Sequence, residues 1–225
     1  MPVKTRWLII LLALVFLLGI VLSGAGAAPS ALPPPEHPNL WPEIAISDFI
    51  NVEGVPDVTY NRKHNEYFVV WQTYDPPAPA TVRGARISAT GRLLANFQIN
   101  GHPSKPSLQP AVDYDPLHDR YLVVFIFGES SGSSKPDLVG RFIPWKGPDP
   151  AFKSFPIAAW STTQIDPDVA YGRAMDEFLV VWGNLYAPPS LLPNYISGRR
   201  IRAADGSFPG TGSDMTISHP SQVRN

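Results

Sequence analysis

The pattern of apolar and polar positions repeats three times along the chain. Each unit opens with an alternating Pro-x-Val-x-Tyr segment, and seven residues after its tyrosine comes a run of five apolar residues. The alternating segments are 56–60, 110–114 and 167–171, and the apolar runs are 67–71, 121–125 and 178–182. A third segment begins at Gly84, Gly140 or Gly198, and a fourth ends at Ile99, Ile157 or Ile217. Such ordered self-similarity is the signature of a repeat architecture.

The four segments of each unit predict four short β-strands. Alternation is typical of a half-covered strand, and a continuous apolar run suits a strand covered on both faces. A unit of about 55 residues with four antiparallel strands has the size of a propeller blade. We therefore predict an all-β, β-propeller-type array of three four-stranded antiparallel blades, at about 56–99, 110–157 and 167–217. A β-sandwich is the alternative.

The segment Pro42–Ser47 has the pattern of the last strand of a unit, but no three strands precede it. It is predicted to be an orphan N-terminal strand at the start of the repeat region, 43–225. Closed propellers have four to eight blades, and only three are found here. The chain is thus expected to be a fragment of a larger propeller, or to complete its ring as a homo-oligomer.

The N-terminus predicts export. Lys4 and Arg6 precede an apolar run and a small-residue stretch ending at Ala27, which is the layout of a signal peptide over 1–27. A Pro-rich spacer over 28–42 follows. An uncleaved membrane anchor is the alternative, because the apolar run is just shorter than the about 17–25 residues that span a bilayer. A secreted or extracytoplasmic location is expected in either case.

Composition excludes several classes of function. The chain has no cysteine, which excludes disulfides and thiolate metal sites. It carries 18 basic and 19 acidic residues, and loss of Lys4 and Arg6 with the signal changes the net charge from −1 to −3. Nucleic acid is therefore not an expected partner, since it requires a clustered basic surface.

The successive Pro-x-Val-x-Tyr, Tyr-Leu-Val-Val-Trp and Gly-x-Arg-Ile segments resemble those of secreted bacterial β-propeller repeat proteins. The resemblance covers 44–217 and implies a fold and an extracellular setting. It implies no catalytic residues, because propellers host many functions.

The search for catalytic and metal-binding groups predicts no catalytic site, metal site or cofactor. Ser130 lies in a G-x-S-x-G sequence, but no helix follows to aim it. His64 and His118 occupy equivalent turns on separate blades, too far apart to share an ion. Asp57 and Asp168 are equivalent carboxylates two blades apart and are not expected to meet as a glycosidase pair.

Loops at one end of the predicted blades form the candidate ligand-binding face. In an antiparallel meander, the loops between second and third strands emerge at the same end as the connections between blades. These loops carry exposed aromatic and charged side chains, which are common anchors for recognition. The candidate residues are Tyr74, His102, Lys105, Trp160, Tyr186 and Tyr195.

The function expected from these observations is that of an exported binding or scaffold module, not an enzyme, with an unknown protein or glycan as its ligand. Contact with a membrane is expected only through an uncleaved N-terminal segment. Two alternatives stay open: an exported propeller enzyme that acts on polysaccharide, and a truncated fragment of a longer propeller protein.

Overall fold

A computed structural model describes residues 43–47, 52–128, 137–159, 162–185, 195–210 and 215–218. From Ile44 onward the chain forms one compact unit. The predicted signal peptide and Pro-rich spacer lie outside the described residues. Within the described part, no helix is long and apolar enough to cross a membrane.

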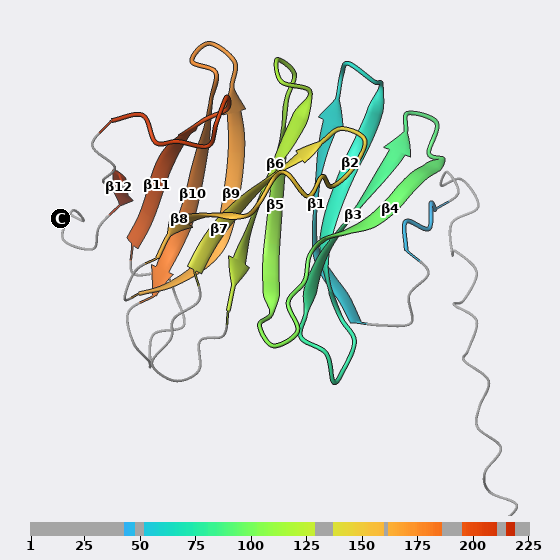
Figure 1. The fold of residues 1–225 in the computed structure, drawn as a ribbon, viewed down its shortest axis with the longest axis horizontal. Coiled ribbons are helices and arrows are strands. Elements are labelled where there is room, and N and C mark those ends of the chain that lie inside the picture. The colour runs from blue at the N-terminus through green and yellow to red at the C-terminus, as the bar shows by residue number, and fades with distance from the viewer. Residues whose placement is uncertain are drawn as a thin grey trace, which may run out of the picture. The chain divides into compact units, whose positions relative to one another are not determined.

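The described strands form three four-stranded antiparallel sheets that follow one another in chain order (Figure 1). The first sheet contains β1 (Val52–Asn61), β2 (Glu66–Tyr74), β3 (Thr81–Ser88) and β4 (Leu93–Asn100). The second contains β5 (Ser107–Asp115), β6 (Arg120–Phe127), β7 (Asp137–Pro144) and β8 (Phe155–Ala158). The third contains β9 (Thr163–Gly172), β10 (Glu177–Leu185), β11 (Tyr195–Arg202) and β12 (Met215–Ser218). The predicted all-β array of three antiparallel blades is confirmed.

The turn between the first two strands is built in the same way in each sheet. The repeated aromatic pairs face each other across it, as in Tyr60 with Tyr67 and Tyr114 with Tyr121. The residue that closes the turn has a positive φ of 52° to 54° and is Asn65, Asp119 or Asp176. Asn and Asp tolerate this left-handed conformation better than other non-glycine residues, which explains their place in each repeat.

Each first strand is interrupted at the proline of its repeat. The residue before that proline has a positive φ, of 50° at Val55, 51° at Gln109 and 48° at Asp166. The strand register shifts at the same places. Proline has no N–H to donate to the ladder, so the strand bulges there and pairs again on either side.

The second sheet is packed between the other two. One core cluster joins Phe68 and Val70 of the first sheet to Tyr121 and Val123 of the second. A second cluster joins the other face of the second sheet to the third, with Leu122 among its buried residues. Burial of apolar side chains between sheets is therefore the main force that holds the stack together.

Aspartates on the first strands add hydrogen bonds between sheets. Oδ2 of Asp57 accepts the N–H of Val112 at 2.8 Å, and Oδ2 of Asp113 accepts the N–H of Tyr171 at 2.7 Å. Each bond joins a side chain of one sheet to the backbone of the next. These bonds fix how far one sheet is shifted along its neighbour. Apolar packing alone specifies this shift weakly.

A pair of side chains across the second and third strands changes from sheet to sheet. Glu66 and Arg86 form an ion pair in the first sheet, with an N–O distance of 2.7 Å, and the third sheet has the equivalent pair Glu177 and Arg200. At these two positions the second sheet has Arg120 and Phe142, and the guanidinium lies 4.0 Å from the ring centroid. Both residues of the pair have thus changed together.

The orphan N-terminal strand is a correction to the predicted fold. Residues 43–47 form no strand and belong to none of the three described sheets. Instead, Ile46 packs against the outer face of the first sheet, on Val69, Trp71 and Ile87. Its repeat equivalent, Ile99, packs on the second sheet in the same manner.

Candidate functional site

The candidate site is a hollow of about 470 Å³ at the end of the sheets where the predicted ligand face lies. Its walls come from the end of β2, the loop to β3, the connection into the second sheet and the start of β5. The lining residues are Val52, Gln72, Tyr74, Pro77, Ala78, Pro79, Ala80, Pro106 and Leu108. Because several of these are prolines, which restrict the backbone, much of the wall is preformed.

A row of polar side chains extends from the hollow across the bulges. Oε1 of Gln72 accepts the N–H of Gln109 at 2.9 Å. The side chain of Gln109 then donates to Oδ1 of Asp166 at 2.9 Å and accepts the N–H of Asp166 at 3.2 Å. The bulges at Gln109 and Asp166 thus bring together two residues from equivalent positions of neighbouring sheets.

This combination of groups suits a ligand rich in hydroxyl groups. Asp166 is exposed, and a carboxylate can accept several hydrogen bonds. Gln72 and Gln109 supply amide donors and acceptors. Tyr74 adds an exposed ring with an apolar face and a polar tip. The non-glycine positive φ values at the bulges are a further feature that is common at functional sites.

The structure brings only part of the predicted ligand face together. Tyr74 lines the hollow. His102 and Lys105 lie in the connection between sheets and gather around Phe127, with ring centroids 5.7 Å apart for His102 and Nζ 5.7 Å from the ring for Lys105. Tyr195 begins β11 in the third sheet. Trp160 and Tyr186 lie outside the described residues, as does Ser130.

The sequence-based search missed Gln72, Gln109 and Asp166. A signal was available, since Gln109 and Asp166 each precede the proline of a repeat, where the strand ladder breaks. The contact between them depends on how neighbouring sheets align, and the repeat pattern alone does not give that alignment.

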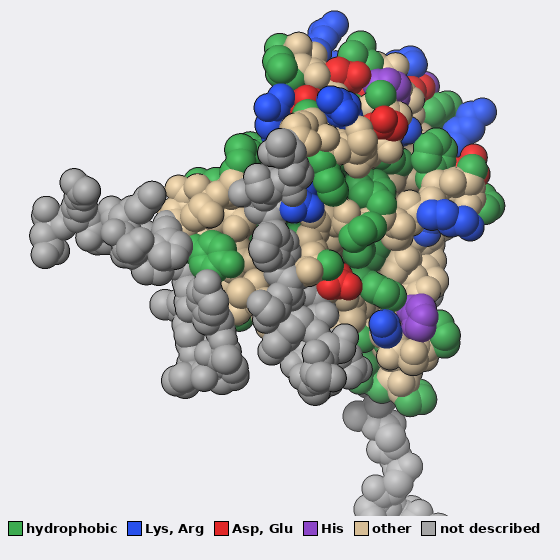
Figure 2. All heavy atoms as spheres, turned by 60° about the vertical axis from the view of Figure 1, so that its left-hand side comes forward, with side chains coloured by type: hydrophobic (Ala, Val, Ile, Leu, Met, Phe, Trp, Pro, Cys, Tyr) green, Lys and Arg blue, Asp and Glu red, His purple; other side chains and the backbone are tan. Residues whose placement is uncertain are grey.

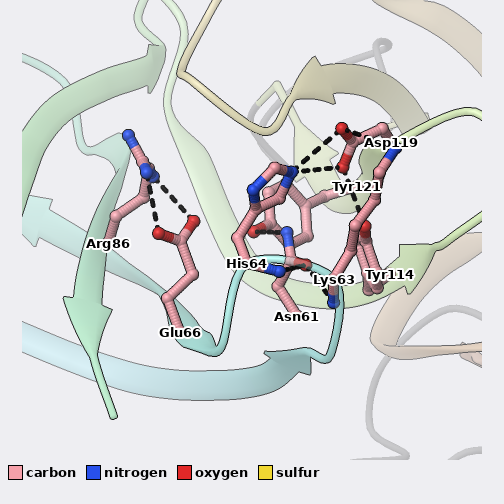
Figure 3. Close-up of polar contacts among 8 residues, drawn as sticks. All are labelled: Asn61, Lys63, His64, Glu66, Arg86, Tyr114, Asp119 and Tyr121. Atoms are coloured by element: carbon pink, nitrogen blue, oxygen red, sulfur yellow. Dashed lines mark hydrogen bonds and ion pairs between the residues drawn. The ribbon is translucent and has the colours of Figure 1, made fainter. Parts of the chain in front are cut away.

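A second polar cluster joins the first and second sheets at the turns between their first two strands (Figure 3). Nε2 of His64 lies 3.0 Å from both carboxylate oxygens of Asp119, and Nζ of Lys63 lies 3.0 Å from one of them. Tyr114 donates its hydroxyl to the same carboxylate at 2.8 Å. Nearby, Asn61 donates to the hydroxyl of Tyr121 at 2.8 Å.

These contacts change the titration of Asp119 and Tyr114. Burial acts to raise the pKa of the Asp119 carboxyl, but hydrogen bonds from His64, Tyr114 and Lys63 outweigh it and lower that pKa. Burial and the bond to Asp119 raise the pKa of the Tyr114 hydroxyl. The cluster therefore favours a charged carboxylate and a neutral phenol at neutral pH, which is the state that holds the sheets together.

One group of residues has the donor types of a metal site. Ligand atoms of Asp115, His118 and Asp176 lie within 4.8 Å of one another. However, the guanidinium of Arg120 lies 3.9 Å from Asp115, where it competes with a cation. The group also occupies the repeat positions of Asn61, His64 and Asp119, and it joins the second sheet to the third as those residues join the first to the second. We therefore interpret it as a structural contact.

Comparison with known proteins finds solved structures with a similar fold. No protein-family model matches the chain, and no curated protein sequence matches it. Among solved structures, an N-acetylgalactosamine deacetylase from F. plautii in complex with blood group B trisaccharide matches with a TM-score of 0.50 and 12% identity, over 68% of this chain and 50% of that one. A thermostable family-43 glycoside hydrolase matches with a TM-score of 0.49 and 9% identity, over 77% of this chain and 60% of the other.

A third similar structure is the parainfluenza virus 5 hemagglutinin-neuraminidase ectodomain, with a TM-score of 0.44 and 7% identity, over 62% of this chain and 31% of that one. The chain thus spans about half of the deacetylase and less than two thirds of the glycoside hydrolase. The likeness to the deacetylase, at 12% identity, supports the fold alone.

The prediction that the protein is not an enzyme is contradicted by the deacetylase, which matches the fold of this chain. The deacetylase shows that a protein with this arrangement of sheets can be an enzyme, although the repeat carries no catalytic motif that we could find in the sequence. The missing motif is therefore no evidence against activity, because function depends on groups placed on the fold and not on the fold's own repeat.

Proposed function

We propose that this protein is an exported propeller enzyme that acts on carbohydrate and binds its sugar in the hollow beside Gln72 and Tyr74. The observation that carries the proposal is the polar row of Gln72, Gln109 and Asp166, which begins in the wall of a hollow that Tyr74 also lines and runs across two backbone bulges. Such convergence of a few polar groups on a preformed concave surface is typical of small-molecule sites.

Each group in the site has a distinct role. The ring of Tyr74 packs on the apolar face of a sugar, and the amide of Gln72 bonds to its hydroxyls. Asp166 is the carboxylate available for proton transfer, since it lies at the exposed end of the row. The presence of blood group B trisaccharide in the deacetylase complex supports an oligosaccharide as the class of ligand to test first.

The test is a panel of oligosaccharides, N-acetylated and not, assayed for binding by calorimetry and for turnover by mass spectrometry. We expect Tyr74→Ala to weaken sugar binding by about tenfold or more, since an aromatic side chain that becomes covered by its ligand commonly contributes over 1 kcal/mol. Asp166→Asn should abolish turnover and leave the melting temperature nearly unchanged. Asp149→Asn is the matched control, because Asp149 is an exposed loop carboxylate that, like Asp166, accepts one hydrogen bond, in its case from the N–H of Ala151.

A protein that binds none of the sugars, or a Tyr74→Ala variant that binds as the wild type does, would contradict the proposal. Export is tested separately by fractionating cells that express the full chain. A mature N-terminus at Ala28 in the extracytoplasmic fraction is the expected result.

A further inference from the structure

A second hollow lies on the outer face of the first sheet, between Ile44 and Ile46 on one side and the strands β1 and β2 on the other. Its volume is about 330 Å³, and Val69 and Trp71 of β2 add to its apolar wall. None of its described lining residues lines the hollow of the proposed sugar site. The two hollows are therefore separate.

Glu53 is the one charged residue among the described residues that line this second hollow. Its Oε1 atom accepts the hydroxyl of Ser47 at 2.6 Å and the indole N–H of Trp71 at 3.0 Å. Both donors bind the same oxygen and Glu53 is exposed, so Oε2 can accept hydrogen bonds from a ligand. Within the part of the chain that the structure describes, no lysine, arginine or histidine forms an ion pair with Glu53.

The repeat shows that the contact made by Glu53 does not require a charge. In the second sheet Ser107 occupies the position of Glu53, and it accepts a hydrogen bond at 2.8 Å from Asn100, which occupies the position of Ser47. In the third sheet the same position is Gln164. Ser107 and Gln164 are neutral and fully buried. The carboxylate thus occurs only at the exposed copy of this position, where it faces a hollow.

The outer face of the third sheet provides a contrast. Figure 2 brings this side of the molecule forward and shows hydrophobic side chains running across it between groups of charged ones. This face also has a hollow, of about 320 Å³, which Leu179, Met215 and Glu177 help to line. Here, however, Glu177 forms an ion pair with Arg200, with an N–O distance of 2.6 Å. The charge of its carboxylate is already balanced, unlike that of Glu53.

We propose that the hollow beside Glu53 binds a small organic cation, with the ammonium group of the ligand on the Glu53 carboxylate and its apolar part against Ile44, Val69 and Trp71. A hydrogen bond between two charged groups orients such a ligand, and the apolar wall removes its carbon atoms from water. The volume of the hollow is near the lower end of the range for ligand sites, so the ligand is small. This inference is independent of the proposed catalytic function.

The test is a titration of the ¹⁵N-labelled protein, purified after expression of the full reading frame, with benzylammonium. The indole N–H signal of Trp71, followed by NMR, is the readout, because this N–H donates to Glu53 and senses a cation bound there. We expect a saturable shift of that signal. Benzyl alcohol and benzoate, which have nearly the same shape, should bind about tenfold more weakly or less, because they lack the bond between charged groups. This comparison uses the wild type and needs no variant.

Glu53→Gln should weaken the binding of benzylammonium by about tenfold or more and reduce its dependence on salt, since the Coulomb attraction is lost. Asp205→Asn is the matched control, because Asp205 is an exposed turn carboxylate that accepts the N–H of Ser207 at 2.9 Å. This control should bind as the wild type does. Tyr74→Ala, which alters the other hollow, should also bind benzylammonium normally.

A Trp71 signal that does not respond to benzylammonium overturns the proposal. So do equal affinities for benzylammonium and benzyl alcohol, and an unchanged affinity in Glu53→Gln. An equal loss of affinity in Asp205→Asn also overturns it, because the effect would then come from the net charge of the protein.

Discussion

The carboxylate of Asp119 receives hydrogen bonds from side chains of two sheets. His64 and Lys63 approach it from the first sheet, and Tyr114 approaches it from its own sheet. Its substitution should therefore affect the contact between sheets and the response of the protein to acid.

We expect Asp119→Asn to lower the free energy of unfolding at pH 7 by about 1–3 kcal/mol, because charged hydrogen bonds are lost. The folded pKa of Asp119 is lowered, so its contribution is complete above the unfolded value of about 3.9 and is lost as the pH falls through the folded value. Urea unfolding at pH 7 and pH 3 measures both effects. The difference between wild type and variant should shrink at pH 3, and an equal difference at both pH values would contradict the assignment.

Three residues adopt a positive φ before a repeat proline, and Val55 is the residue type least suited to that backbone conformation. A β-branched side chain at a φ of 50° is strained, whereas Asn adopts this region readily. Val55→Asn should therefore raise the free energy of unfolding by about 0.5–1 kcal/mol, since the side chain is exposed and little burial is lost. Thermal melts test this, with Val52→Asn as the control, because Val52 is an exposed valine of the same strand outside the bulge.

Among the strands, β7 depends on a contact that crosses from one sheet to the next. The guanidinium of Arg141 donates to the carbonyl of Ile99 at the end of β4 and, at 3.0 Å, to the carbonyl of Phe152. Arg199 makes the equivalent bond from the third sheet to Ile157. These arginines tie the last strand of one sheet to the third strand of the next.

Arg141→Met should lower the free energy of unfolding by about 1.5–3 kcal/mol, because two backbone carbonyls lose a charged donor. Hydrogen exchange should increase in β4 and β8 more than in β2. Arg62→Met is the control, since Arg62 is exposed in a turn. Equal exchange in β2 and β4 would indicate a general loss of stability instead of a loosened contact.

The strands were predictable because the repeat supplies three versions of each. The predicted blades begin four, three and four residues after the first residues of β1, β5 and β9, because the prediction starts each first strand at its repeat proline. The proline interrupts the backbone pairing, but the strand also pairs with its neighbour on the N-terminal side of the bulge. The reading of residues 43–47 as a strand failed for a related reason: an apolar pattern specifies burial, whereas a strand also needs a neighbour to bond.

The candidate site was predictable only in part. Tyr74 was identified because loops between second and third strands share one end of the sheets. Gln109 and Asp166 were not, because they lie 57 residues apart and meet only through the alignment of neighbouring sheets. The sequence repeat predicts the strands of each sheet, whereas the contacts between sheets depend on tertiary packing.

At the scale of the whole molecule, the second sheet contributes to both of the core clusters that lie between sheets. Leu122 lies in one cluster and Tyr121 in the other, so loss of packing on either face should destabilise all three sheets. Unfolding is therefore expected to be a single cooperative transition, with coincident changes in far-UV and near-UV circular dichroism.

Leu122→Ala should lower the free energy of unfolding by about 2–5 kcal/mol and keep the transition single, because a fully buried leucine is truncated in a packed core. Denaturant unfolding followed by both signals provides the measurement. Leu117→Ala at an exposed turn should change stability by no more than about 0.5 kcal/mol. Two separated transitions in the Leu122→Ala variant would show that the sheets unfold independently.

The change of the cross-strand pair from Glu66 and Arg86 to Arg120 and Phe142 has a consequence during folding. Chains built from similar units can misfold by exchanging strands between units. If β2 paired with β7, Glu66 would lie beside Phe142 and lose its counter-ion, and if β6 paired with β3, Arg120 would face Arg86. Because neighbouring sheets use opposite chemistry at this position, each strand discriminates against the wrong neighbour while the chain is still assembling.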